Sequence, residues 1–133
     1  MSFSSADAQR QAIERLTLAR RDQVAATALR AHPEISFSII AFHAQQCIEK
    51  CMKAVLAKSG VIYPRTHDLD DLYVLLLASG LVMPVSRELL NDITPYAVTS
   101  RYEVDADDLV THAQIDEAVA TSVAWASSLV NLS

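Results

Sequence analysis

Glycine and proline are scarce in this sequence, with two and four occurrences in 133 residues. Both residues punctuate turns and loops, so their scarcity argues against a fold of many short strands. Alanine, leucine, valine and isoleucine are abundant instead, and long helices joined by short connections use them best. We therefore expect one domain over residues 1–133 that is all-α, an up-and-down four-helix bundle with an additional short helix.

Motifs that carry catalysis or bind metals are also missing. The sequence has no glycine-rich phosphate loop and no nucleophile elbow, and its four histidines never pair at the spacing of a helical metal site. The two cysteines, Cys47 and Cys51, lie four residues apart on one helical face, where a disulfide is geometrically unfavourable and burial is expected. We therefore expect no catalytic residue, no metal and no cofactor.

Apolar runs are short, and charge is unevenly distributed. No run approaches the roughly 20 residues of a membrane helix, and the N-terminus does not resemble a signal peptide, so we expect a cytoplasmic protein without a membrane partner. Residues 1–65 hold nine Lys and Arg against five Asp and Glu, whereas residues 66–133 hold two against eleven. A basic face on the early helices could attract phosphate, and an ordinary solvated surface would give the same counts.

Five helices are predicted from the spacing of apolar residues and from the signals at their ends. The first spans residues 5–31 and is broken by His32-Pro33. The second spans residues 34–59 and ends at Gly60. The expected buried stripe of the first helix is Ile13, Leu16, Arg20, Val24 and Ala28. That of the second is Phe37, Ile40, Ala44, Cys47, Ile48, Cys51 and Val55.

Capping residues define the later helices. Asp68 is the expected N-cap of the third helix, which ends at Ser79-Gly80, and Ser86 is the N-cap of the fourth, which ends near Pro95. Thr111 followed by Gln114 forms a capping-box pattern at the start of the last helix. The acidic segment 103–108 is expected to be a solvated loop between the last two helices.

A narrow polar stripe runs beside the apolar face of the second helix. At about 100° per residue, it contains His43, Gln46, Lys50 and Lys53. Arg65 and His67 precede the third helix, where backbone N–H groups favour an anion. If the bundle gathers these groups with the Arg101-Tyr102 pair, they form a phosphate or nucleotide site. The candidate ligand-binding or docking residues are Gln46, Lys50, Lys53, Arg65, His67, Arg101 and Tyr102.

An alternative explanation of these residues is purely structural. His67 and Asp68 would then cap a helix, and Arg101 would pair with the acidic loop. Gln46 and Glu49 would pack within the bundle or at an interface between chains. From the residues alone the two explanations are equally balanced.

Three segments of the chain resemble the HEPN family of small helical domains, which occur beside minimal nucleotidyltransferases. They are AFHAQQCIEKCMKAVLAKSG at residues 41–60, THDL at residues 66–69 and SRY at residues 100–102. The resemblance covers most of residues 35–102. It implies a helical bundle, homodimerisation, and a role with a nucleotide or a nucleotidyltransferase partner, including as one half of a toxin–antitoxin pair.

Some members of that family are ribonucleases, which resemble one another in an Arg-x4-6-His motif. The motif is absent here: the fifth to seventh residues after Arg101 are Ala106, Asp107 and Asp108, which would repel phosphate and supply no general acid at neutral pH. We therefore expect a binding module more than an enzyme, with RNA a less favoured partner than protein or nucleotide. The alternatives are a divergent ribonuclease, using Arg65 with His67 or Arg101 with His112, and a structural scaffold.

Overall fold

The computed structural model describes residues 5–98 and 110–131, and within these ranges the chain contains helices and no strand. The helices are α1 (Ser5–Arg30), α2 (Phe37–Lys58), α3 (Leu69–Ala78), α4 (Arg87–Ile93), the short 3-10 helix η1 (Thr94–Ala97) and α5 (His112–Val130). The all-α bundle expected from the sequence is confirmed. No described helix is both long enough and apolar enough to cross a membrane. The predicted acidic loop lies outside the described residues.

Local capping chemistry fixes where the shorter helices begin. The Asp68 side chain accepts a hydrogen bond from the backbone N–H of Asp70, and Ser86 caps α4 in the same way. Thr111 and Gln114 form the predicted reciprocal capping box at α5. These three helix starts therefore follow from side chains that satisfy backbone donors in the first turn.

The ends of α2 follow equally local rules. Gly60 has a φ angle of +75°, which suits glycine because it has no Cβ, and α2 stops just before it. The helix begins at Phe37, slightly later than expected, because backbone hydrogen bonds within residues 28–35 form turns after α1.

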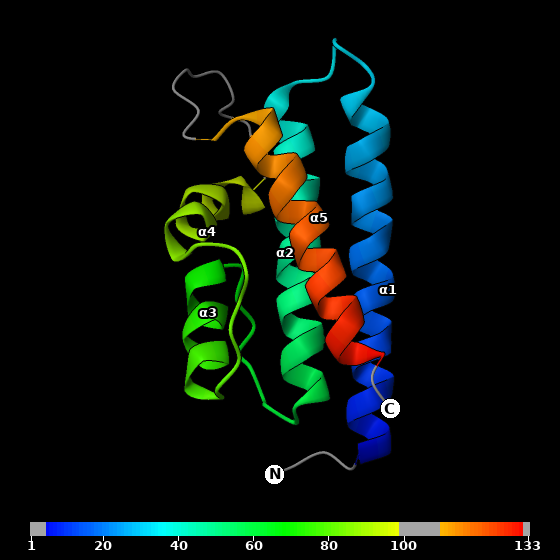
Figure 1. Cartoon of the computed structure of the whole chain (residues 1–133). Coiled ribbons are helices and arrows are strands. Elements are labelled where there is room, and N and C mark those ends of the chain that lie inside the picture. Colours follow the sequence, from blue (N-terminus) through cyan, green and yellow to red (C-terminus); the bar gives the residue numbers. More distant parts are fainter. Residues whose placement is uncertain (1–4, 99–109, 132–133) are drawn as a thin grey trace.

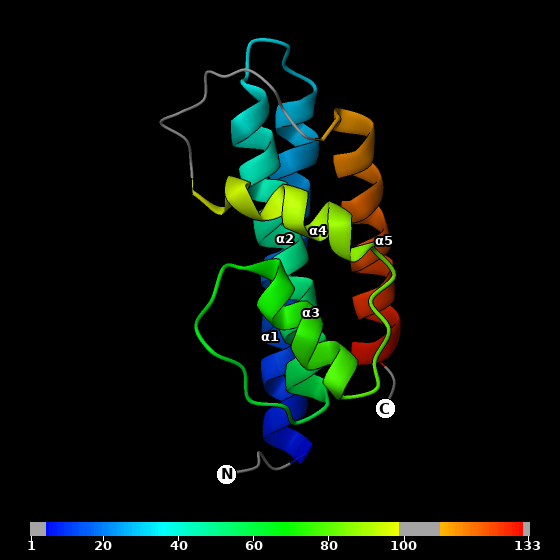
Figure 2. The same cartoon turned by 90° about the vertical axis from the view of Figure 1, so that its left-hand side faces the viewer.

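Helix α2 lies at the centre of the molecule and contacts α1, α3, α5 and η1 (Figure 1). In the view of Figure 2, α3 and α4 form a layer in front of α2. The connections at residues 59–68 and 79–86 return along the bundle, so α3 and α5 run in the same direction as α2 and opposite to α1 (Figure 1). As a result, most residues of α2 are buried.

The apolar stripe predicted for α2 forms much of the core. Its residues from Ile40 to Val55 are buried, and Phe37 packs against the core at the start of the helix. Both cysteines are free and buried. A hydrogen bond with Cys47, together with burial, raises the pKa of the Cys51 thiol far above its usual range. The thiols therefore act as small hydrophobic side chains, as expected.

The buried stripe predicted for α1 is wrong except at Leu16. Ile13 and Val24 are 46% and 68% exposed, and Arg20 and Ala28 also face solvent. The buried positions are instead Ala8, Ala12, Leu16, Ala19 and Ala26. Alanine has a short side chain, so a face of alanines lets α1 approach the enclosed helix α2 closely, and close packing decides which face is buried.

This correction is testable by truncating one side chain from each stripe. Leu16→Ala should lower the free energy of unfolding by about 2–5 kcal/mol because it leaves a cavity. Val24→Ala, the matched control on the exposed face, should change it by no more than about 0.5 kcal/mol. Urea denaturation measures both, and equal losses would contradict the observed orientation of α1.

Candidate functional site

The polar side chains of α2 divide into two groups that face different neighbours. His43 and Lys50 turn toward α1, where His43 Nδ1 lies 3.2 Å from Asp22 Oδ1 and Lys50 Nζ lies 2.6 Å from Asp22 Oδ2. Gln46 donates a 2.7 Å hydrogen bond to the side-chain oxygen of its neighbour Gln45. Asp22 therefore neutralises one of the two lysines of the predicted site and joins α1 to α2.

The second group is a row of Gln45, Glu49 and Lys53, which are all buried. Lys53 Nζ donates a 3.0 Å hydrogen bond to Glu49 Oε2, and Gln45 Nε2 lies 3.2 Å from Glu49 Oε1. A buried carboxylate is costly unless it is paired and hydrogen-bonded, and Glu49 meets both conditions. The second predicted lysine is therefore also bound to a carboxylate of the same chain.

His67 connects this row to the loop that precedes α3. Its Nδ1 lies 2.9 Å from Glu49 Oε1, and since a carboxylate only accepts, the Nδ1 hydrogen is the donor. Gln45 Nε2 also donates to the backbone oxygen of His67 at 2.9 Å. The four residues Gln45, Glu49, Lys53 and His67 are called the Glu49 network below. The His67 side chain is 70% exposed and that of Glu49 only 4%, so a buried carboxylate orients a surface imidazole.

Tyr63 extends the same contacts to α1. Arg15 Nε donates a 3.2 Å hydrogen bond to the Tyr63 hydroxyl, and Lys53 Nζ lies 5.6 Å from the centroid of the Tyr63 ring. The loop between α2 and α3 is therefore attached to α1 as well as to α2.

Backbone donors at the start of α3 are already satisfied. The N–H of Leu69 donates to Thr94 Oγ1, that of Asp70 to the Asp68 side chain, and that of Asp71 to the Asp68 carbonyl. The three aspartates also bring negative charge to this turn. An anion therefore finds no free N–H group among the first three residues of α3.

Arg87 compensates part of that negative charge. Its guanidinium binds both Asp70 oxygens, at 2.7 and 3.0 Å, and this hydrogen bonding lowers the pKa of Asp70 below its usual value. This arginine, the first residue of α4, is therefore also engaged by a carboxylate of the same chain.

The structure places the predicted site residues in separate environments. Lys53 and His67 meet at Glu49, whereas Gln46 and Lys50 lie farther round α2 and Lys50 pairs with Asp22. Arg65 is exposed in the loop. Arg101 and Tyr102 lie outside the described residues, so the structure does not test their placement. Within residues 5–98 and 110–131, no three His, Cys, Asp or Glu side chains gather as a metal site would need.

Sequence reasoning missed Gln45 and Asp22, and assigned Glu49 no partner. Gln45, Glu49 and Lys53 follow one another at steps of four, a spacing that places complementary polar groups side by side on a helix. That signal was available in the sequence. No such signal marks Asp22 in the sequence, because its pairing depends on how α1 packs against α2.

These features define an all-helical module in which a central helix holds the following loop through a buried polar network. A comparison with models of protein families matches the HEPN domain over residues 10–124. The match covers most of the chain, and the protein belongs to the HEPN domain family. Comparisons with curated proteins and with solved structures gave no match.

Removing one charge from the Glu49 network should destabilise the fold. Lys53→Ala leaves the buried Glu49 carboxylate without its ammonium partner, and we expect a loss of about 3 kcal/mol in the free energy of unfolding. The double variant Glu49→Gln/Lys53→Met removes both charges and should lose less than Lys53→Ala alone. Urea denaturation at pH 7 gives both values. Arg87→Ala, at an exposed ion pair, is the control and should change stability little.

Proposed function

We propose that this protein is a non-nuclease HEPN module that acts as a homodimer and docks a minimal nucleotidyltransferase, as one half of a toxin–antitoxin pair. One observation carries the proposal: Lys50, Lys53 and His67 of the predicted phosphate site are each bound to a carboxylate of the same chain. A group that holds its own counter-ion has to lose that partner before it binds phosphate, and the exchange reduces any gain in affinity.

The turn at the start of α3 supports docking over nucleotide binding for a second reason. Its first backbone donors are occupied and Asp68, Asp70 and Asp71 lie beside them. What the loop offers to a partner is the exposed Arg65 and the outer edge of His67, which the Glu49 network holds in place. A surface group held in one orientation loses little entropy when a protein partner binds it.

A ribonuclease function has less support. The Arg-x4-6-His motif is absent from the sequence. Of the alternative pairs, Arg65 and His67 are two residues apart in the loop, and Glu49 holds the Nδ1 of His67. His112 packs edge-on against Phe37, with ring centroids 4.7 Å apart, and its Nδ1 is buried. A buried imidazole nitrogen is poorly placed to exchange a proton with RNA.

The docking function is tested by mixing the purified protein with the minimal nucleotidyltransferase of the same genome. We expect a stable complex in sedimentation velocity, and weaker binding for Arg65→Ala/His67→Ala than for the wild type. Lys58→Ala, at the C-terminal end of α2, is the control. RNA incubated with the protein alone should stay intact. Cleavage that disappears in Arg101→Ala, without any complex, would replace docking by the nuclease function.

Nucleotide binding is tested by thermal shift with ATP, GTP, CTP and UTP. A ligand of the native state raises the melting temperature by mass action, and we expect no shift for the isolated protein because the described cations of the candidate site are largely paired. Arg65→Ala is the right comparison variant, since its side chain is exposed, whereas a change at Lys53 would disturb the buried network. A shift in the wild type that Arg65→Ala abolishes would establish a nucleotide site and refute this expectation.

A further inference from the structure

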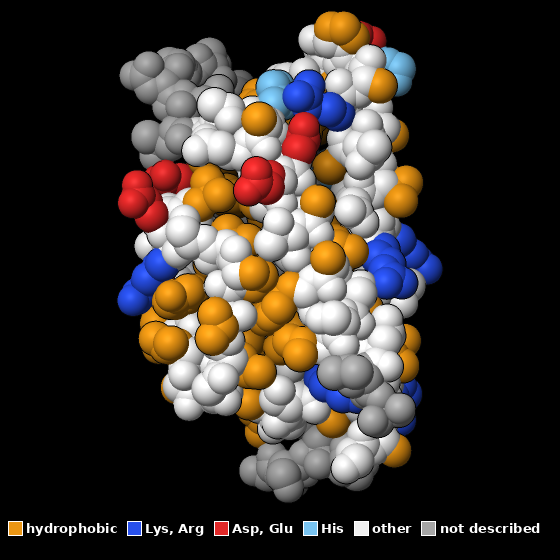
Figure 3. Space-filling model, in the orientation of Figure 1, with side chains coloured by type: hydrophobic (Ala, Val, Ile, Leu, Met, Phe, Trp, Pro, Cys, Tyr) orange, Lys and Arg blue, Asp and Glu red, His pale blue; other side chains and the backbone are white. Residues whose placement is uncertain are grey.

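Large apolar side chains are exposed on α3 and on the linker 79–86 that follows it. Leu77 on α3 and Val82 in the linker are 59% and 79% exposed, and Val74 adds to them. Figure 3 shows hydrophobic side chains gathered over α3, the linker and the neighbouring side of α5. Trp125 and Leu129 of α5 are partly buried against the core. Contiguous apolar surface of this kind marks an interaction site more often than single exposed residues do.

A groove with a volume of about 320 Å³ lies between the linker and α5. Pro84, Leu89 and Ala118 supply its apolar walls, and Glu117 and Thr121 supply polar groups from α5. Among the residues that the structure describes, no lysine or arginine lines it. The groove therefore has both polar and apolar walls, and Glu117 places a carboxylate in one of them.

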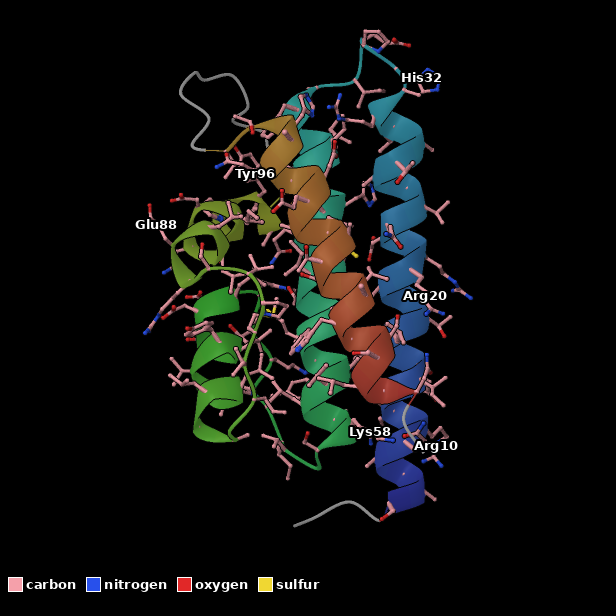
Figure 4. The ribbon with its side chains drawn as sticks, in the orientation of Figure 1. Arg10, Arg20, His32, Lys58, Glu88 and Tyr96 are labelled. Atoms are coloured by element: carbon pink, nitrogen blue, oxygen red, sulfur yellow. The ribbon has the colours of Figure 1, made fainter. Side chains whose placement is uncertain are left out.

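The surroundings of the groove are acidic as well. Glu88 is exposed on the outer side of α4 (Figure 4), one residue before Leu89 of the groove wall. Arg87, the cation closest to it in the chain, is held by both oxygens of Asp70. Figure 3 shows acidic side chains beside the hydrophobic area on this face. A partner of opposite charge would be attracted here, with an effect that falls as salt rises.

We propose that this face, formed by α3, the linker 79–86 and α5, binds an amphipathic helix of the partner protein that carries apolar side chains and lysine or arginine. The apolar residues would cover Leu77 and Val82, and the basic residues would face Glu88 and Glu117. Binding of an amphipathic helix along a surface groove is a common mode of protein recognition. The inference rests on the proposed docking function and adds a second contact surface, besides the loop that carries Arg65 and His67, together with the chemistry of the partner helix.

A helical peptide with leucine on one face and lysine on the other is a suitable probe, measured by fluorescence anisotropy against the whole protein. We expect it to bind, more weakly as salt rises, while the same peptide with glutamate in place of lysine does not. Leu77→Ser/Val82→Ser should weaken binding about tenfold. Ile13→Ser/Val24→Ser is the matched control, since it removes two exposed aliphatic side chains from α1, and should bind as the wild type does.

The acidic part of the surface is tested by a second double variant with its own matched control. Glu88→Gln/Glu117→Gln should reduce both the affinity for the lysine peptide and its dependence on salt, whereas Glu14→Gln/Glu34→Gln, at exposed sites elsewhere, should change neither. Equal binding of the peptide by all variants would refute the proposal. Self-association of the wild type that Leu77→Ser/Val82→Ser abolishes would also refute it, because a second copy of the chain would then cover this face. If the nucleotidyltransferase binds the wild type and Leu77→Ser/Val82→Ser equally, docking stands and this surface is wrong.

Discussion

The enclosure of α2 is the constraint on which the rest of the structure depends. Helices α1, α3 and α5 surround it, so water does not reach most of its side chains and its polar groups have to find partners inside the chain. Asp22 supplies one partner from α1, and His67 supplies another from the loop before α3. The contacts that pair the polar side chains of α2 therefore also fix the positions of the neighbouring segments.

The buried carboxylate of Glu49 has the largest consequence of this kind. Replacing it together with Lys53 by apolar residues would avoid the cost of burying two charges, and such replacements often keep or raise stability. What an apolar pair would not supply is the hydrogen bond that orients His67 at the surface. The network thus links a feature of the core to a group that a partner can contact.

The two sides of the molecule differ in character. Exposed residues of α1 combine arginines with Ile13 and Val24, and Arg20, labelled in Figure 4, donates a 2.8 Å hydrogen bond to Ser127 Oγ of α5. The opposite side combines the apolar surface of α3 and the linker with glutamates. This separation follows the uneven charge of the sequence, in which the first half is basic and the second acidic. It gives the protein two surfaces with different electrostatic preferences for a partner.

Much of the fold could be predicted because its signals are local. The Asp68 and Ser86 caps and the Gly60 terminus each depend on a few adjacent residues, and each formed where expected. The buried face of α1 could not be predicted in this way. Ile13 and Val24 are more apolar than alanine, and only the close approach to α2 favours the smaller side chain.

The sequence by itself determined the helices, the segments that resemble the HEPN family and the lack of the ribonuclease motif, because each depends only on residues close together in the chain. Tertiary structure decided which charges remain available. Lys50 and Lys53 look alike in the sequence, but packing gives them different carboxylates, and it makes His67 a member of a buried network. Electrostatic pairing depends on distances between segments far apart in the chain, and only the folded structure sets those distances.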